Sequence, residues 1–178
     1  MLPNYLKPKI SIKLIRMGSL TDGGYFIPLK IIKKIKKIIS CGLGIDWSFE
    51  ENFKNKNKGV EITFYDHSIN TFFWIKNFFY YLYFYLRYRQ NFKIIFAYFY
   101  YYKFFRNKKI NKKKIKISKN DNLNKNIISL KNLLKLERNH ILLKVDIEGD
   151  EYKVLNQIIK YQQKLDCLII EFHKININ

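Results

Sequence analysis

The chain alternates short apolar runs with segments whose apolar residues recur at helical spacing. Nearly continuous apolar runs occupy residues 38–41, 60–65, 140–145 and 165–172, and each has the length of a buried strand. Helices are predicted at 128–136 and 150–161, and another is predicted to begin at a capping box formed by Ser48 and Glu51. Strands that alternate with helices predict an α/β fold, with a mostly parallel sheet and helices on both faces.

The segments outside this alternation are shorter or more polar. Residues 1–30 form a predicted N-terminal hairpin region, since the turn residues 21–24 (Thr-Asp-Gly-Gly) precede the strand-like residues 25–28. Residues 30–37 indicate one or two helical turns, and the polar connection 111–126 holds a weak strand at 114–117. With 178 residues, one domain spanning 1–178 is expected.

Aromatic residues dominate residues 72–105, where they fill twenty of thirty-four positions. Basic residues interrupt this segment too often for a membrane span: Lys76, Arg87, Arg89, Lys93 and Lys103. Apolar residues at helical spacing predict a helix face that packs inward: Ile75, Phe78, Phe79, Leu82 and Leu86. The remaining tyrosines leave three interpretations open: a substrate cleft, a membrane-surface contact, or simple coverage of the sheet. We treat residues 72–126 as an aromatic and basic helical insertion followed by the polar connection.

The composition adds a strong positive charge, because 34 Lys and Arg stand against 14 Asp and Glu, for a net charge of +20. The excess is mostly Lys rather than the base-reading Arg, so a general basic surface is favoured over specific nucleic-acid binding. Cys41 and Cys167 lie in or beside apolar runs, which indicates buried thiols in a reducing cytosol. Residues 1–16 lack the continuous apolar core of a signal peptide. We therefore expect a cytoplasmic protein, with membrane association as the alternative.

The loop after the first buried strand carries the candidate cofactor residues. Gly42 and Gly44 allow a tight turn and close approach of a ligand. Asp66 ends the next strand, where a carboxylate can accept hydrogen bonds from ribose hydroxyls. A dinucleotide fingerprint would have a third glycine where this chain has Trp47, and Asp46 would repel a pyrophosphate. A cofactor with a sulfonium and no phosphate meets neither objection, so the pattern favours S-adenosylmethionine over NAD.

Acidic residues gather where the two later strands end. Asp146 and Glu148 follow one strand, and Glu171 and His173 end the next. The carboxyl ends of neighbouring parallel strands meet at one sheet edge, so these side chains are expected to share a site. Asp150 and Glu151 are interpreted instead as acids of a helix's first turn, where the helix dipole favours them.

With these motifs in view, the sequence resembles the FkbM-type methyltransferases. The resemblance rests on Lys-x-Asp-x-Glu-Gly at residues 144–149, with Glu151, and is supported by residues 22–25, 65–68 and 170–173. It implies a Rossmann-like class I methyltransferase fold, S-adenosylmethionine as cofactor and O-methylation of sugars or polyketide-like molecules. That fold normally has two further strands after the one that ends at residue 172 here. We therefore expect a sheet that lacks its last two strands, either because the sequence is a fragment or because the sheet has lost an edge.

By motif match, the resemblance assigns Gly42, Gly44 and Asp66 to the cofactor and places Asp146 and Glu148 beside the reacting centre. The full set of cofactor candidates is Cys41, Gly42, Gly44, Asp66, His67 and Asp146. The substrate candidates are Asp22, Tyr25 and Glu171. The central expectation is that Gly42, Gly44, Asp66 and Asp146 converge on one pocket.

The catalytic candidates follow from the need to deprotonate an alcohol. For that base we favour Asp146 or His173, with Glu148 orienting substrate or cofactor. No resident metal is expected, and the alternative is a divalent ion held by Asp146, Glu171 and His173.

The leading hypothesis is an S-adenosylmethionine-dependent O-methyltransferase that acts on a small-molecule or carbohydrate hydroxyl. Three alternatives stay open. The first is a degenerate, non-catalytic protein that still binds the adenosyl ligand or a partner chain. The second is a basic and aromatic peripheral membrane protein, and the third and least favoured is a nicotinamide oxidoreductase.

Overall fold

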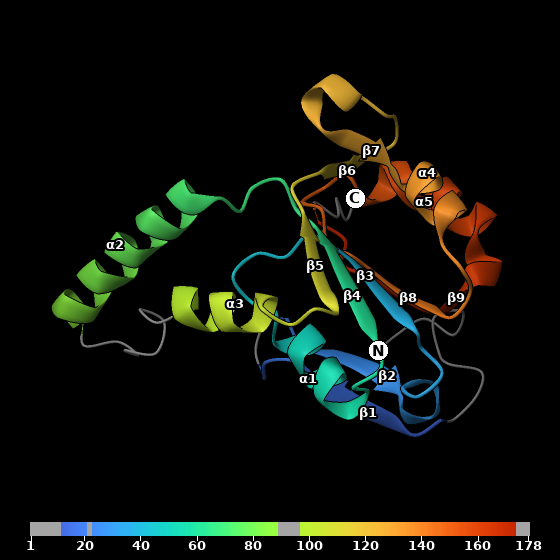
Figure 1. Cartoon of the computed structure of the whole chain (residues 1–178), viewed down its shortest axis with the longest axis horizontal. Helices are drawn as coiled ribbons and strands as arrows, with labels where there is room; N and C mark the ends of the chain where they lie inside the picture. The colour runs from blue at the N-terminus through green and yellow to red at the C-terminus, as the bar shows by residue number, and fades with distance from the viewer. Residues whose placement is uncertain (1–11, 21–22, 89–96, 174–178) are drawn as a thin grey trace, which may run out of the picture.

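The computed structural model describes residues 12–20, 23–88 and 97–173, which are built around a parallel sheet of five strands (Figure 1). In spatial order the strands are β5 (Ile110–Lys113), β4 (Glu61–Tyr65), β3 (Lys37–Cys41), β8 (Ile141–Val145) and β9 (Leu165–Ile170). From the central β3, the chain builds outward to β4 and β5 on one side and later to β8 and β9 on the other. The order therefore reverses between β3 and β8, and open α/β sheets bind ligands at such a switch point.

Both faces of the sheet are covered (Figure 1). One face carries the antiparallel hairpin and two helices: β1 (Leu14–Met17), β2 (Tyr25–Pro28), α1 (Ser48–Lys56) and α3 (Ala97–Phe105). The other face carries two helices, α4 (Leu130–Leu136) and α5 (Glu151–Lys160), and receives Ile117 from the small parallel pair β6 (Lys116–Ser118) and β7 (Ile127–Ser129). Short 3-10 turns complete the connections: η2 (Leu29–Ile31), η4 (Leu123–Lys125) and η5 (Gln162–Lys164).

Successive side chains of the central strands enter opposite cores. Ile38 and Leu142 pack with the hairpin, α1 and α3, whereas Ile39 and Leu143 pack with α4 and α5. Burial on both faces explains why these strands are almost continuously apolar. The predicted α/β architecture, with a parallel sheet and helices on both faces, is confirmed.

Several predicted boundaries need correction. The described part of the predicted hairpin region forms the antiparallel pair of β1 and β2, while residues 1–11, Thr21 and Asp22 lie outside the described residues. Helix α1 begins at Ser48 as predicted, but the capping box is wrong: Trp47 is the N-cap, and the Asp46 carboxylate accepts the Ser48 amide hydrogen bond at 2.8 Å. The segment 128–136 begins as strand β7 and becomes helical only at Leu130.

Helix α2 (Thr71–Tyr88) overturns the prediction of an inward-packed face. It projects away from the sheet (Figure 1), and side chains predicted to be inside are exposed, including Ile75 at 49% and Phe79 at 63%. Trp74, in the first turn, reaches the core, where Tyr101 of α3 packs against it at a ring-centroid distance of 4.7 Å. Beyond this contact, the rest of α2 extends past the sheet (Figure 1). None of the described helices combines the length and apolarity that crossing a membrane requires.

Candidate functional site

A pocket of about 250 Å³ lies at the carboxyl ends of β3, β4 and β8, at the switch point of the sheet. Its lining comes from the ends of these strands, from the loops that follow β4 and β8, and from β6 with the residue before it. The lining residues are Gly42, Tyr65, Asp66, His67, Ser68, Ile115, Lys116, Ile117, Asp146, Ile147, Glu148 and Asp150. The structure thus brings Gly42, Asp66 and Asp146 to one pocket, as the sequence led us to expect.

Gly42 permits the close contact between the ends of β3 and β8. Its φ angle is +89°, and a Cβ atom there would lie 1.8 Å from the Asp146 carbonyl oxygen. The Asp146 amide donates to the Cys41 carbonyl at 2.9 Å, and the Gly42 amide donates to the Tyr65 carbonyl at 3.0 Å. Any side chain at Gly42 would therefore force these strand ends apart and deform the pocket floor.

Asp66 joins two loops of the pocket through its carboxylate. Oδ2 accepts from the Leu43 amide at 2.9 Å, while Oδ1 accepts from the amide and hydroxyl of Ser68 and from the Ile69 amide. Burial alone would raise the pKa of Asp66, but these hydrogen bonds outweigh it and hold the pKa below its usual value. Asp66 is therefore an ionised organiser of the loop, and Oδ2 retains a lone pair for a ligand hydroxyl.

His173, just after β9, meets three carboxylates. Its Nδ1 lies 3.0 Å from Oε1 of Glu151, and its Nε2 lies 3.7 Å from Oδ1 of Asp146 and 3.9 Å from Oε2 of Glu148. The hydrogen bond to Glu151 raises the pKa of His173, burial opposes this, and the neighbouring charges of Glu148, Glu151 and Asp146 raise the pKa further. An Nδ1–H donated to Glu151 leaves Nε2 facing Asp146.

Glu151 was interpreted from the sequence as a helix acid only, and its contacts add a second role. It lies in the first turn of α5 as expected, yet it is fully buried and accepts from the amides of Ile147 and Gly149. Burial would raise the pKa of Glu151, but these amides and His173 lower it. Its carboxylate thereby fixes the loop after β8 and the imidazole together.

Asp146 connects the pocket to the imidazole, since it lines the former and faces the latter. Burial raises the pKa of Asp146, Glu171 and Glu148 raise it further, and Lys144 and His173 oppose them. Glu148 is largely exposed, has a φ angle of +56° and lines the same pocket. A carboxylate with a raised pKa, open to a pocket, is suited to accept a proton.

A largely buried polar chain lies beside Asp146 and includes the substrate candidates Tyr25 and Glu171, which hydrogen-bond to each other and do not line the pocket. Lys144, in the middle of β8, places Nζ 3.6 Å from Oε1 of Glu50 and 5.3 Å from the centroid of the Tyr25 ring. The Tyr25 hydroxyl donates to Oε2 of Glu171 at 2.8 Å, and burial followed by this contact raises the pKa of Tyr25 far above its usual value. A lysine inside an apolar strand was the one available signal, because its partner Glu50 is remote in sequence.

The other candidates occupy distinct places. His67 lines the pocket and is exposed. The Cys41 side chain is fully buried in the α4–α5 core, where burial raises its pKa to about 12, and Cys41 does not line the pocket, although its carbonyl accepts the Asp146 amide hydrogen bond. Gly44, which was expected to converge on the pocket, does not line it, and a Cβ built on Gly44 would meet no atom within 4 Å beyond its neighbours in the chain. Asp22 lies outside the described residues.

Within the described part of the chain, the atoms that could together hold a metal ion are those of Asp146, Glu151 and His173, all within 4.8 Å of one another. Glu171, named in the alternative metal set, instead accepts the Tyr25 hydrogen bond. Because Glu151 already accepts backbone amides with both oxygens, this trio fits the orientation of an imidazole better than the coordination of a metal.

Comparison of the chain with protein-family models, with curated proteins and with solved structures finds no match in any of the three. Assignment of a function therefore depends on the chemistry of the site itself.

Proposed function

We propose that the chain binds S-adenosylmethionine in the pocket at the switch point and transfers its methyl group to a hydroxyl of a small or sugar-like molecule. The observation that carries this proposal is the shared pocket of Gly42, Asp66 and Asp146, at the position where open α/β sheets bind nucleotide-like ligands. The motif resemblance to FkbM-type methyltransferases supports it independently, because it was drawn from the sequence alone.

The character of the pocket supports a cationic, phosphate-free ligand. Four carboxylates line it, namely Asp66, Asp146, Glu148 and Asp150, against the single ammonium of Lys116. This balance would repel a pyrophosphate and attract a sulfonium or an amino group. Gly42 keeps the ends of β3 and β8 close together beneath the pocket, and Oδ2 of Asp66 provides the acceptor for a ribose hydroxyl. At about 250 Å³ the pocket is somewhat smaller than most ligand sites, so part of the cofactor would lie along its rim.

In the proposed reaction, the chain's residues align the acceptor and take its proton. The bound cofactor supplies a methyl group already activated by its positive sulfur. Asp146 receives the proton of the acceptor hydroxyl, because its carboxylate opens on the pocket and its pKa is raised. Glu151 holds His173 with Nε2 toward Asp146, and Glu148 contributes a second acceptor for the substrate's hydroxyls.

Calorimetry with S-adenosylmethionine tests the cofactor assignment. We expect saturable binding to the wild-type chain and loss of binding in Gly42→Ala, whose new methyl group would collide with the Asp146 carbonyl. Gly59→Ala is the matched control, since its Cβ meets only the Asn57 side chain at 3.3 Å. Equal affinity in both variants, or binding of NAD instead, would contradict the assignment. Binding without methyl transfer to any sugar or alcohol tested would favour the non-catalytic alternative.

A further inference from the structure

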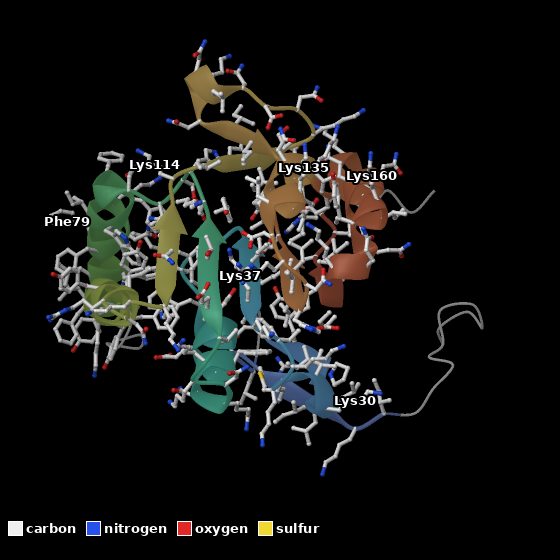
Figure 2. The ribbon with its side chains drawn as sticks, turned by 45° about the vertical axis from the view of Figure 1, so that its right-hand side comes forward. Lys30, Lys37, Phe79, Lys114, Lys135 and Lys160 are labelled. Atoms are coloured by element: carbon white, nitrogen blue, oxygen red, sulfur yellow. The ribbon has the colours of Figure 1, made fainter. Side chains whose placement is uncertain are left out.

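Helices α2 and α3 carry a concentration of exposed apolar side chains, which we call the aromatic arm: residues 71–88 and 97–105. Ten of the large exposed side chains of the described chain belong to it: Phe72, Ile75, Phe78, Phe79, Tyr80, Tyr83, Leu86, Phe99, Tyr100 and Tyr102. Figure 2 shows Phe79 on the outer side of α2, among further aromatic rings. The core of the domain does not use this surface, because α2 projects beyond the sheet (Figure 1).

The arm presents a continuous stripe along α2. Phe72, Phe79 and Leu86 are spaced by seven residues, so they lie on one side of the helix, and they are exposed by 73%, 63% and 72%. Phe78 and Tyr80, on other sides of the helix, are also exposed, by 42% and 53%. An 18-residue helix extends about 27 Å, and one that is apolar nearly all round requires an apolar environment.

The charge around the arm is of one sign. From residue 67 to residue 120 the sequence holds thirteen Lys or Arg and neither Asp nor Glu. Exposed basic side chains of this segment include Lys76 on α2, Lys103 on α3, and Lys108 and Lys109 just after α3. The arm therefore offers apolar rings bordered by cations, a combination that suits an anionic and partly apolar surface.

We infer that the aromatic arm is a docking surface for an anionic lipid bilayer, in which α2 lies along the headgroup boundary. Aromatic rings and long lysine side chains both occupy that boundary favourably. A second copy of the chain is a poorer occupant, because symmetric pairing would bring two sets of these cations together. A nucleic acid is also poorer, because the two helices of the arm carry only three basic residues, Lys76, Arg87 and Lys103, and their exposed surface is mainly apolar.

Adsorption through the arm would also place the candidate pocket near the lipid. Ser68 lines the pocket, and α2 begins three residues later at Thr71. The docking inference itself does not depend on the proposed methyl transfer, and it is tested without cofactor.

The test is co-sedimentation of the full chain with vesicles of phosphatidylcholine alone and of phosphatidylcholine with 30% phosphatidylserine. The apolar variant is Phe72→Ser/Phe79→Ser/Leu86→Ser, and its matched control is Leu20→Ser/Leu123→Ser/Leu136→Ser, which removes side chains exposed by 89%, 80% and 82% elsewhere. The charge variant is Lys76→Gln/Lys103→Gln/Lys108→Gln, with Lys30→Gln/Lys33→Gln/Lys160→Gln as control. All these side chains are exposed, and far-UV circular dichroism of each variant verifies the fold.

We expect binding to the anionic vesicles that weakens at least about tenfold when salt rises from 0.05 to 0.5 M. The arm variants should each lose at least about tenfold in partitioning, while both controls stay within about twofold of wild type. Equal losses in arm and control variants would overturn the inference. Equal binding of the wild type to neutral and to anionic vesicles would also overturn it. So would a wild type that does not bind vesicles but forms a dimer or an RNA complex that the apolar variant does not form.

Discussion

Replacement of Lys144 by Met should cost the fold about 3–5 kcal/mol, because it strands a buried carboxylate. The side chains of Lys144 and Glu50 are exposed by only 4% and 0%, and their charged atoms lie 3.6 Å apart. Oε1 of Glu50 also accepts from the Ser40 hydroxyl at 2.6 Å, whereas Oε2 has no hydrogen-bond partner among the described residues. Without Lys144, a neutral hydroxyl would be the main compensation left for the charge of Glu50.

The double variant Glu50→Gln/Lys144→Met should recover much of this loss, because it removes both charges together. Equilibrium urea unfolding of the wild type, the two single variants and the double variant gives the coupling free energy. We expect a coupling of about 2 kcal/mol or more, a large part of the 5–15 kcal/mol that stabilises most domains. Additive effects, or a Lys144→Met cost below about 1 kcal/mol, would refute the account of a buried, mutually dependent pair.

Two further predictions concern groups whose pKa is shifted. Glu151→Gln should lower the pKa of His173, because the hydrogen bond to Glu151 is the main cause that raises it. An NMR titration of the imidazole measures this pKa, and no change in the variant would exclude the contact. The pKa of His173 is raised in the fold, so its stabilising contribution is present below the unfolded value of about 6.5 and is lost as pH rises through the folded pKa. For Asp66 the sign is opposite: its pKa is lowered in the fold, so its stabilising contribution is present above the unfolded value of about 3.9 and is lost as pH falls. In urea unfolding, Asp66→Asn should therefore lower the free energy of unfolding by about 1.5–3 kcal/mol at pH 7 and by less at pH 3. A loss that grows toward acid pH would be inconsistent with an ionised Asp66 that holds the loop.

The central strands could be predicted from the sequence because burial on both faces leaves an almost unbroken apolar signal. Ile38 and Ile39 enter opposite cores, so an apolar side chain is required at both positions of β3. The edge strand β5 was missed, because Ile110 is its one buried residue and lysine and asparagine fill the rest. Helical spacing in α2 gave the helix but not its surroundings, since periodicity does not reveal whether an apolar face meets protein or another medium.

The candidate site was predictable where it depends on strand ends and not where it depends on distant partners. Glycine after β3 and acids after β4 and β8 follow from topology, and Gly42, Asp66 and Asp146 indeed share a pocket. The hydrogen bond between Glu151 and His173 joins residues 22 positions apart, and the one between Tyr25 and Glu171 joins residues 146 positions apart. Such pairings arise from how the loops pack, for which a single sequence carries no local pattern.

The most direct test of the central claim is a titration of the isotope-labelled chain with S-adenosylmethionine, followed by amide NMR signals. The account predicts saturable shifts at Gly42 and Leu43 after β3, at Asp66 after β4 and at Ile147 after β8, with the hairpin strand β1 unchanged. Shifts confined to the hairpin or to the aromatic arm, or no shifts at millimolar cofactor, would contradict it.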